Sequence, residues 1–306
     1  MTLEQLRIFV AVAEREHLTR AATALRLTPS AVSSAIRVLE DRHGAVLFHR
    51  VGRRIELTDA GRIFLGEARA TLARAEAAEL VLTELGDLRR GALTLHASQT
   101  IAGYWLPQHV VRFHDAHPGI NISLSVGNTE TVARAVVEGG AELGLVEGDV
   151  DAPALAAVTV AQDRIVVVVK PDHPWAGRRT LTADDIRAMD WVLREPGSGT
   201  RSVFEQAVAR AGIDPATLNV ALMLPSNEAV RAAVELGGRA TAISQLVVAS
   251  YLATGRLVQV PFPIPPRAFR LLSHKERHRT KASLAFEALL TGRTPAPARP
   301  TPRVRS

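Results

Sequence analysis

The chain has 306 residues, of which 47% are hydrophobic, and its formal net charge at pH 7 is +6. This length accommodates two or three domains with substantial cores. The absence of cysteine excludes disulfides, thiolate catalysis and cysteine-ligated metals. No apolar run reaches membrane-spanning length, and the charged N-terminal helix does not resemble a signal peptide, so we expect a cytoplasmic protein.

Charge is distributed unevenly along the chain. Residues 1–90 carry 14 basic and 12 acidic side chains, residues 91–266 carry 13 and 17, and residues 267–306 carry 10 and 2. The central region is therefore mildly acidic, and the C-terminal region is basic. Because proline recurs after Gly292, we expect residues 293–306 to form a disordered, basic, proline-rich tail.

The first sixty residues predict three short helices. An apolar face in the first helix comes from Leu3, Leu6, Phe9, Val10 and Ala13. Thr19 is expected to cap a second helix. Thr28 suits the cap of a third helix and Pro29 its first position, where a missing N–H costs nothing. That third helix turns Val32, Ile36 and Leu39 inward and ends at Gly44.

The outer face of the third helix carries small hydroxyl groups and one arginine, which suit contacts with base edges and phosphates. A basic hairpin follows, and its tip is rich in arginine. Residues 17–57 contain seven arginines against three acidic side chains, which predicts salt-dependent binding to DNA. The alternative is a three-helix structural domain with a solvated hairpin. The candidate DNA-binding residues are Thr28, Pro29, Ser30, Ser33, Ser34, Arg37, Arg50, Arg53 and Arg54.

Residues 58–88 contain no proline and are rich in Ala, Leu, Glu and Arg, which predicts one long helix. An approximate heptad seam is formed by Leu65, Ala68, Leu72, Ala75 and Leu82, and Glu79 interrupts it. The helix could lie on its own chain, but an exposed apolar stripe favours pairing with a second copy. We therefore expect a homodimer or homotetramer.

From residue 91 onward, strands and helices alternate, which predicts parallel or mixed sheets with helices on both faces. The expected strands are 92–97, 120–126, 142–146, 164–169, 190–194, 219–224, 240–244, 257–260 and 267–273. The fold class is therefore α/β in this region.

Small polar residues follow several of these strands, where ligands of open α/β sheets bind. Glycines in the Gly197–Thr200 loop leave backbone N–H groups open, and its hydroxyls add donors, so the loop suits an anion. The alternative is an ordinary helix-capping loop, and capping is at least as strong an interpretation for Pro225–Asn227. The candidate effector-binding residues are Ser98, Gln99, Thr100, Thr129, Glu147, Gly197, Ser198, Gly199 and Thr200, with Glu147 expected to orient neighbours or accept a ligand donor.

The histidines do not form a metal-binding pattern. His109, His114 and His117 are spaced five and three residues apart, and no pair has the i, i+4 spacing of a helical zinc site. A nucleophile with a histidine–acid pair and a cofactor fingerprint are also missing from the sequence. We therefore expect no metal, no cofactor and no enzymatic activity.

Six N-terminal segments together resemble the signature of LysR-type transcriptional regulators. These are Leu6–Phe9, Leu18–Ala22, Thr28–Ser33, Ile36–Glu40, Leu47–Arg50 and Leu57–Gly61. The resemblance implies a winged helix-turn-helix, a long linker helix that pairs two readers, and a two-lobed effector domain like a periplasmic binding protein. It places the strands that cross between lobes near residues 161–168 and 260–268. Family members often have a basic residue where this chain has Ser34.

Other segments resemble the subgroup that contains regulators of carbon fixation and of sulfur assimilation. They are Ser98–Ile101, Tyr104, Leu106–Pro107, Leu145–Gly148 and Arg194–Arg201. The effectors of that subgroup are small anions such as sulfur oxyanions, acylated serine and phosphorylated sugars or acids.

These observations predict a DNA-binding domain at 1–58, a linker helix at 59–90 and an effector domain at 91–292. Its first lobe is expected at 91–161 and 268–292, and its second at 162–267. We expect a regulator that reads an inverted-repeat operator in double-stranded DNA and responds to a small anion in the cleft. The alternatives are a ligand-independent repressor or architectural DNA-binding protein and, less well supported, an α/β enzyme.

Overall fold

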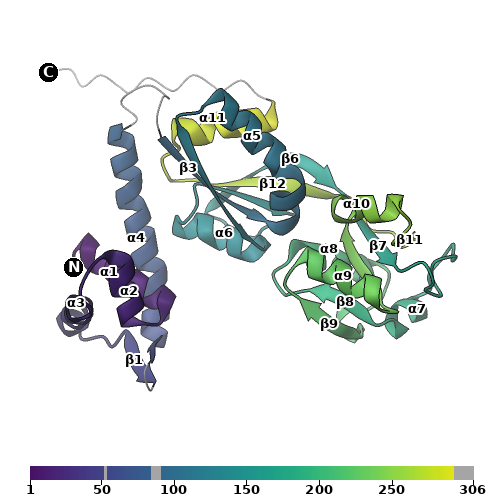
Figure 1. Cartoon of the computed structure of the whole chain (residues 1–306), viewed down its shortest axis with the longest axis horizontal. Coiled ribbons are helices and arrows are strands. Elements are labelled where there is room, and N and C mark those ends of the chain that lie inside the picture. Colours follow the sequence, from purple (N-terminus) through teal and green to yellow (C-terminus); the bar gives the residue numbers. More distant parts are fainter. Residues whose placement is uncertain (52–53, 84–90, 293–306) are drawn as a thin grey trace. The chain divides into compact units, whose positions relative to one another are not determined.

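A computed structural model describes residues 1–51, 54–83 and 91–292. The chain divides into two compact units, one built mainly from residues up to Leu85 and the other mainly from residues after Gly86 (Figure 1). Within the described ranges, no helix is both long enough and apolar enough to cross a bilayer.

The N-terminal unit is a winged helix-turn-helix followed by a long helix. Its core is formed by apolar residues of the first three helices together with Leu47, Phe48, Ile55 and Leu57 of the wing region. The elements are α1 (Leu3–Arg15), α2 (Leu18–Leu25), α3 (Pro29–His43), β1 (Phe48–Val51), β2 (Arg54–Leu57) and α4 (Asp59–Thr83). The expected fold class is confirmed here. The end of the long helix, expected near Leu88, lies outside the described residues.

The helix boundaries follow from local capping. Thr28 accepts the backbone N–H of Ala31 at 3.2 Å, Pro29 is the first residue of α3, and Gly44 ends that helix at φ 61°. The prediction that Thr19 caps α2 is wrong. The helix begins at Leu18, which packs against the core, so the cap is His17, whose Nδ1 accepts the N–H of Arg20 at 3.5 Å.

Two side chains bond the wing (β1 and β2) to the helices of the N-terminal unit, which we call the head. Glu40 of α3 accepts the backbone N–H groups of Leu47 at 2.7 Å and Phe48 at 3.1 Å. Thr58 donates to the carbonyl of Val46 at 2.8 Å and accepts from the N–H of Gly61 at 2.9 Å. These bonds fix the wing relative to α3.

Gly61 of α4 lies against the backbone that precedes the wing. A Cβ atom there would lie 2.1 Å from the carbonyl oxygen of Leu47, whereas a Cβ at Gly66 would meet nothing within 4 Å. We expect Gly61→Ala to destabilise the head by about 1–3 kcal/mol, since packed backbone must move. Hydrogen–deuterium exchange of the α1–α3 amides should show faster opening, while the control Gly66→Ala should leave or improve protection. Equal protection in the two variants would contradict this account of the packing.

The first lobe of the second unit is a sheet with strands in the order β4-β3-β5-β12-β6. The first three run parallel, and β12 is antiparallel to both of its neighbours. Helices α5 and α11 pack on one face and α6 on the other (Figure 1). Its elements are β3 (Gly91–Ser98), a π-helical turn (Ile101–Trp105), α5 (Leu106–Ala116), β4 (Ile120–Gly127), α6 (Thr129–Glu138), β5 (Leu143–Glu147), β6 (Leu155–Asp163), β12 (Arg267–His274) and α11 (Lys281–Thr291).

The second lobe contains the sheets β10-β7-β11 and β8-β9, which a parallel bridge between Trp191 and Ala240 connects. Its buried residues form two apolar clusters on the two sides of β7. The elements are β7 (Ile165–Val169), α7 (Ala183–Ala188), β8 (Trp191–Arg194), α8 (Gly199–Arg210), a 3-10 turn (Pro215–Thr217), β9 (Val220–Leu224), α9 (Asn227–Leu236), β10 (Thr241–Ser244), α10 (Gln245–Ala253) and β11 (Val258–Val260).

Strand β6 was not among the expected strands. Its side chains alternate between more and less buried, but half of its apolar residues are alanine, so the pattern is weak in the sequence. It pairs antiparallel with β12, and this pairing places Asp163 opposite Arg267. The chain passes from one lobe to the other directly after Asp163 and returns directly before Arg267.

Candidate functional site

The outward face of α3 carries the predicted polar side chains. Ser30, Ser34 and Arg37 are exposed, and Ser33 is half-buried. The hydroxyls of Thr28 and Ser30 lie 3.1 Å apart at the start of the helix. Among the wing candidates, Arg50 and Arg54 belong to β1 and β2 but their side chains are not described, and Arg53 lies outside the described residues.

In the second unit, the predicted effector-binding residues come from both lobes and lie close together. From the first lobe, Ser98, Thr100 and Glu147 are buried, while Gln99 and Thr129 are half-buried. From the second lobe, Ser198 and Thr200 are buried at the start of α8, and Gly197 (φ 82°) precedes them. A Cβ at Gly199 would lie 2.7 Å from both the Glu147 carbonyl oxygen and the Thr129 hydroxyl, so the lobes touch here.

A buried ion pair that the sequence did not suggest lies where the two crossing strands meet. The Nε and Nη2 atoms of Arg267 donate to Oδ2 of Asp163 at 2.9 and 2.7 Å. Both side chains are only 1% exposed, and the other oxygen of Asp163 accepts the Ser244 hydroxyl at 2.8 Å. The carboxylate of Glu147 lies 3.8 Å from Arg267 Nη2. No local pattern could reveal this pair, because its members are 104 positions apart.

Arg267 also reaches one threonine from each lobe. It donates to the hydroxyl of Thr200 at 3.1 Å and to that of Thr100 at 3.5 Å. Thr100 accepts a second donor, the side-chain amide of Asn227, at 3.1 Å. A hydroxyl has one proton and two lone pairs. Both lone pairs of Thr100 and one of Thr200 are therefore filled by N–H donors, which leaves their O–H protons available for an acceptor.

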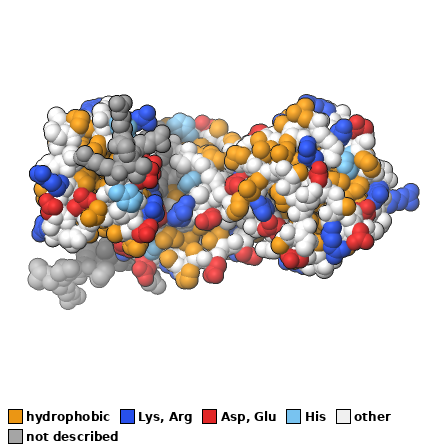
Figure 2. All heavy atoms as spheres, turned by 90° about the horizontal axis from the view of Figure 1, so that it is seen from below, with side chains coloured by type: hydrophobic (Ala, Val, Ile, Leu, Met, Phe, Trp, Pro, Cys, Tyr) orange, Lys and Arg blue, Asp and Glu red, His pale blue; other side chains and the backbone are white. Residues whose placement is uncertain are grey.

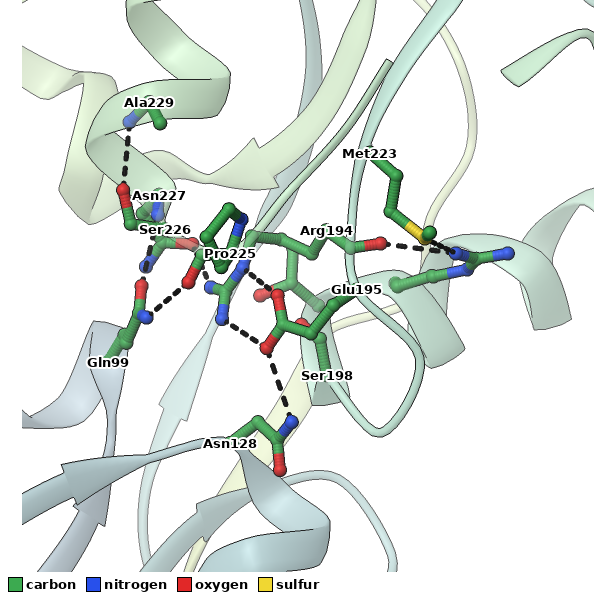
Figure 3. A network of polar contacts seen from close by, with 12 residues as sticks. Gln99, Asn128, Arg194, Glu195, Ser198, Met223, Pro225, Ser226, Asn227 and Ala229 are labelled. Atoms are coloured by element: carbon green, nitrogen blue, oxygen red, sulfur yellow. Dashed lines mark hydrogen bonds and ion pairs between the residues drawn. The ribbon is translucent and has the colours of Figure 1, made fainter. Parts of the chain in front are cut away.

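A network of side chains joins the lobes (Figure 3). The side chain of Gln99 donates to the Pro225 carbonyl at 2.7 Å and accepts the backbone N–H of Asn227 at 3.0 Å. Asn227 is fully buried, and its side-chain oxygen accepts from Arg194 Nη1 at 2.7 Å. Gln99 therefore bridges to the second lobe, a role that the sequence did not predict.

Glu195 is the other partner of Arg194. Its carboxylate accepts from Arg194 Nε at 2.8 Å and Nη2 at 2.9 Å, and from the Asn128 side chain of the first lobe at 3.2 Å. Partial burial raises the pKa of Glu195, but the hydrogen bonds from Arg194, its own backbone and Asn128 outweigh burial and hold that pKa below its usual value. Glu195 is therefore a carboxylate at neutral pH.

Tyr104 and Glu228 form a further bond between the lobes. The Tyr104 hydroxyl donates to the Glu228 carboxylate at 3.1 Å. Burial, and then the negative charge of Glu228, raise the pKa of Tyr104 to about 12, so the phenol keeps its proton.

The two helix entrances in the second lobe differ in capping. Ser226 caps α9 by accepting the N–H of Ala229 at 3.0 Å, which agrees with the capping interpretation of Pro225–Asn227. Ser198 occupies the cap position of α8, but its side chain makes no capping hydrogen bond. In the first lobe, the buried hydroxyl of Ser98 has no partner among the described residues. A buried hydroxyl without a partner is costly, so Ser98 suits a ligand.

On the face drawn in Figure 2, the described Lys and Arg side chains lie among Asp and Glu side chains, with no broad area of one sign. Arg194 and Arg267, the two arginines at the centre of the contact between the lobes, are both buried. Both arginines are therefore buried beside carboxylates and are not displayed at the surface.

Comparison with known families matches both parts of the chain. Residues 3–62 match the family described as "Bacterial regulatory helix-turn-helix protein, lysR family". Residues 86–295 match the family described as "LysR substrate binding domain". The chain belongs to the LysR family of transcriptional regulators. The predicted family and the predicted architecture are confirmed.

Individual relatives of this LysR-family regulator are similar to it in sequence or in fold. The RuBisCO operon transcriptional regulator of Allochromatium vinosum is 34% identical over 258 residues, which cover 84% of each chain. The solved complex of CbnR with its target DNA has a TM-score of 0.66 at 22% identity and covers 95% of this chain and 99% of that one. The regulatory domain of Synechocystis CcmR, solved with 2-PG, has a TM-score of 0.60 at 25% identity and covers 66% of this chain and 97% of that one.

Proposed function

We propose that this regulator binds an inverted-repeat operator in double-stranded DNA as a homodimer or homotetramer. In this proposal residues 1–58 form the DNA-binding domain, and residues 59–90 form the helix that pairs two copies. Ser30, Ser33 and Arg37 face the bases, and Thr28, Pro29 and Ser34 lie on the same DNA-binding surface. Arg50, Arg53 and Arg54 contact phosphates. Because its target is the chromosome, the protein acts in the cytoplasm.

We further propose that a small anion in the cleft of residues 91–292 modulates this binding. One observation carries the proposal: Arg267 and Asn227 fill lone pairs of Thr100 and Thr200, so both hydroxyls are left as donors. Oxyanions accept several such bonds at once. Ser98, Ser198 and the N-terminus of α8 add donors, which favours negative charge further. The CcmR relative, solved with 2-PG, supports a ligand in this fold.

Thermal unfolding of the full-length protein tests the effector class. Inorganic sulfate, inorganic phosphate and 2-PG should each be compared with a neutral polyol and an organic cation at equal ionic strength. A ligand of the folded state raises the melting temperature with concentration. We expect the shift for at least one anion; stabilisation by the cation or the polyol alone would refute an anionic effector.

Arg37→Ala tests the recognition helix. Arg37 is exposed on the outward face of α3, so its loss should leave the fold intact. We expect specific operator binding to weaken by about 1–3 kcal/mol, because one base or phosphate contact is lost. Gel-shift titrations at fixed salt measure this, with Arg112→Ala, an exposed arginine of α5, as the charge-matched control. Unchanged operator affinity in Arg37→Ala would show that α3 is not the reading helix.

A further inference from the structure

The cleft between the two lobes contains more negative than positive side chains. Among the described residues that join the lobes at its centre, Arg194 and Arg267 are cationic, while Glu147, Asp163 and Glu195 are acidic. An anion entering this cleft meets a negative surplus unless one carboxylate gives way. Which carboxylate moves away is a question that rests on the proposed anionic effector.

Two of the three carboxylates are fixed. Asp163 is 1% exposed and uses both oxygens, one for Arg267 and one for Ser244. Glu147 is 3% exposed, and α8 packs directly against it, since a Cβ at Gly199 would lie 3.2 Å from the Glu147 Cβ. Neither side chain can reach solvent without displacing the elements that pack against it.

Glu195 differs from both in burial and position. Its side chain is 25% exposed, and it lies on the loop between β8 and α8, two residues before Gly197, whose φ is 82°. Its only partners beyond the adjacent Arg194 and its own backbone, within the described contacts, are the Asn128 amide at 3.2 Å and the Ser198 N–H, which bonds its carbonyl at 3.2 Å. The carboxylate can therefore swing toward solvent while the backbone stays in place.

Arg194 is the guanidinium that this movement would free. It is 4% exposed, and the described contacts use Nε and Nη2 for Glu195 and Nη1 for Asn227 (Figure 3). Arg267, by contrast, keeps its own buried carboxylate. On Arg194, Glu195 therefore occupies the position that an oxyanion of a ligand would take, at distances typical of charge-assisted hydrogen bonds.

We propose that Glu195 is an internal competitor of the effector: the anion displaces its carboxylate from Arg194. Binding is then an exchange of one anion for another on the same guanidinium, so the departing carboxylate offsets part of the negative charge that the effector brings. The displaced carboxylate also releases Asn128 of the first lobe, so the exchange removes one bond between the lobes. Glu195 thereby sets the effector concentration to which the regulator responds.

Titration calorimetry of the full-length protein with inorganic phosphate and with 2-PG tests this exchange. Glu195→Gln removes the competing charge and should tighten anion binding roughly tenfold or more, which corresponds to about 1.4 kcal/mol. The control Glu205→Gln changes the net charge equally, but Glu205 pairs with Arg201 along α8 and does not contact Arg194. We expect the control to alter affinity less than about twofold, since partly exposed pairs contribute little.

A second variant changes no charge. Asn128→Ser removes the amide donor to Glu195, but a serine hydroxyl can still accept the N–H of Thr131, which Asn128 now accepts at 3.0 Å. The Glu195 carboxylate then leaves Arg194 more easily, so anion binding should tighten, by a smaller factor than in Glu195→Gln. Tightening in this neutral variant cannot arise from the overall charge of the protein.

The outcomes separate the two proposals. If the unmodified protein binds phosphate or 2-PG and neither variant binds more tightly, Glu195 has a structural role and the exchange is refuted, while the anionic effector stands. If neither the unmodified protein nor folded Glu195→Gln binds these anions or sulfate at millimolar concentration, the anionic effector is refuted together with the exchange. Melting temperatures of all variants, measured without ligand, identify those that are folded.

Discussion

Arg267→Ala should cost the effector-domain unit a large share of its stability. The substitution leaves the Asp163 carboxylate, 1% exposed, without its cation, and it removes the donor shared by Thr100 and Thr200. Breaking one side of a buried pair costs about 3–5 kcal/mol, because the remaining charge stays desolvated. All three tryptophans lie in this unit, so denaturant unfolding followed by tryptophan fluorescence reports on it directly.

Two companion variants separate this effect from the loss of any arginine. Arg270→Ala, on the same strand, loses a pair with Asp149, which is 85% exposed, and should cost less than about 1 kcal/mol. The double variant Asp163→Leu with Arg267→Met removes both charges and should recover much of the lost stability. If Arg267→Ala were no less stable than Arg270→Ala, the buried pair would not stabilise the junction of the crossing strands.

Thr200→Val should abolish most of the response to an anion. Valine keeps the branched shape of the buried side chain but lacks the O–H proton that Arg267 leaves free for a ligand. Losing one hydrogen bond to a charged ligand should weaken binding by about 1.5–3 kcal/mol, or roughly 10- to 100-fold. Calorimetry with the anion that stabilises the unmodified protein measures the change.

Operator affinity without effector should remain normal in Thr200→Val, because the substitution is remote from α3 in the sequence and belongs to the other compact unit. Thr217→Val, an exposed threonine of the same lobe, is the matched control and should bind the anion as the unmodified protein does. An unaltered anion affinity in Thr200→Val would show that the hydroxyl does not contact the ligand. The pocket would then have to be sought elsewhere in the effector domain.

In the head, local capping residues predicted the ends of one helix correctly and those of another incorrectly. Thr28, Pro29 and Gly44 specify the ends of α3 within one turn of the helix, and the structure has α3 at Pro29–His43. The cap of α2 was misplaced by two residues, because Leu18 joins the core and extends the helix toward His17. Helix existence follows from periodicity, whereas the terminal residue depends on which neighbour is buried.

In the effector domain, the sequence predicted most strands and the polar loops but not the bonds between distant residues. The alternation of strands and helices predicted α/β sheets, and the family resemblance implied two lobes. Strand β6 was missed because its alternation is weak in the sequence. The glycines and hydroxyls of Ser98–Thr100 and Gly197–Thr200 marked strand ends where a ligand could bind. The sequence did not predict the bonds that each of these residues makes. Gln99, for example, uses its side-chain amide to bond Pro225 and Asn227 of the opposite lobe.

By itself, the sequence determined the family, the winged helix-turn-helix and the polar loops, because each of these depends on residues within a few positions of one another. Only the tertiary structure decided which groups are charged partners in the cleft. Asp163 meets Arg267 through strand pairing, and Glu195 meets Asn128 through contact between lobes. Such pairs arise from the registers of distant strands and from packing of whole lobes, neither of which a local pattern encodes.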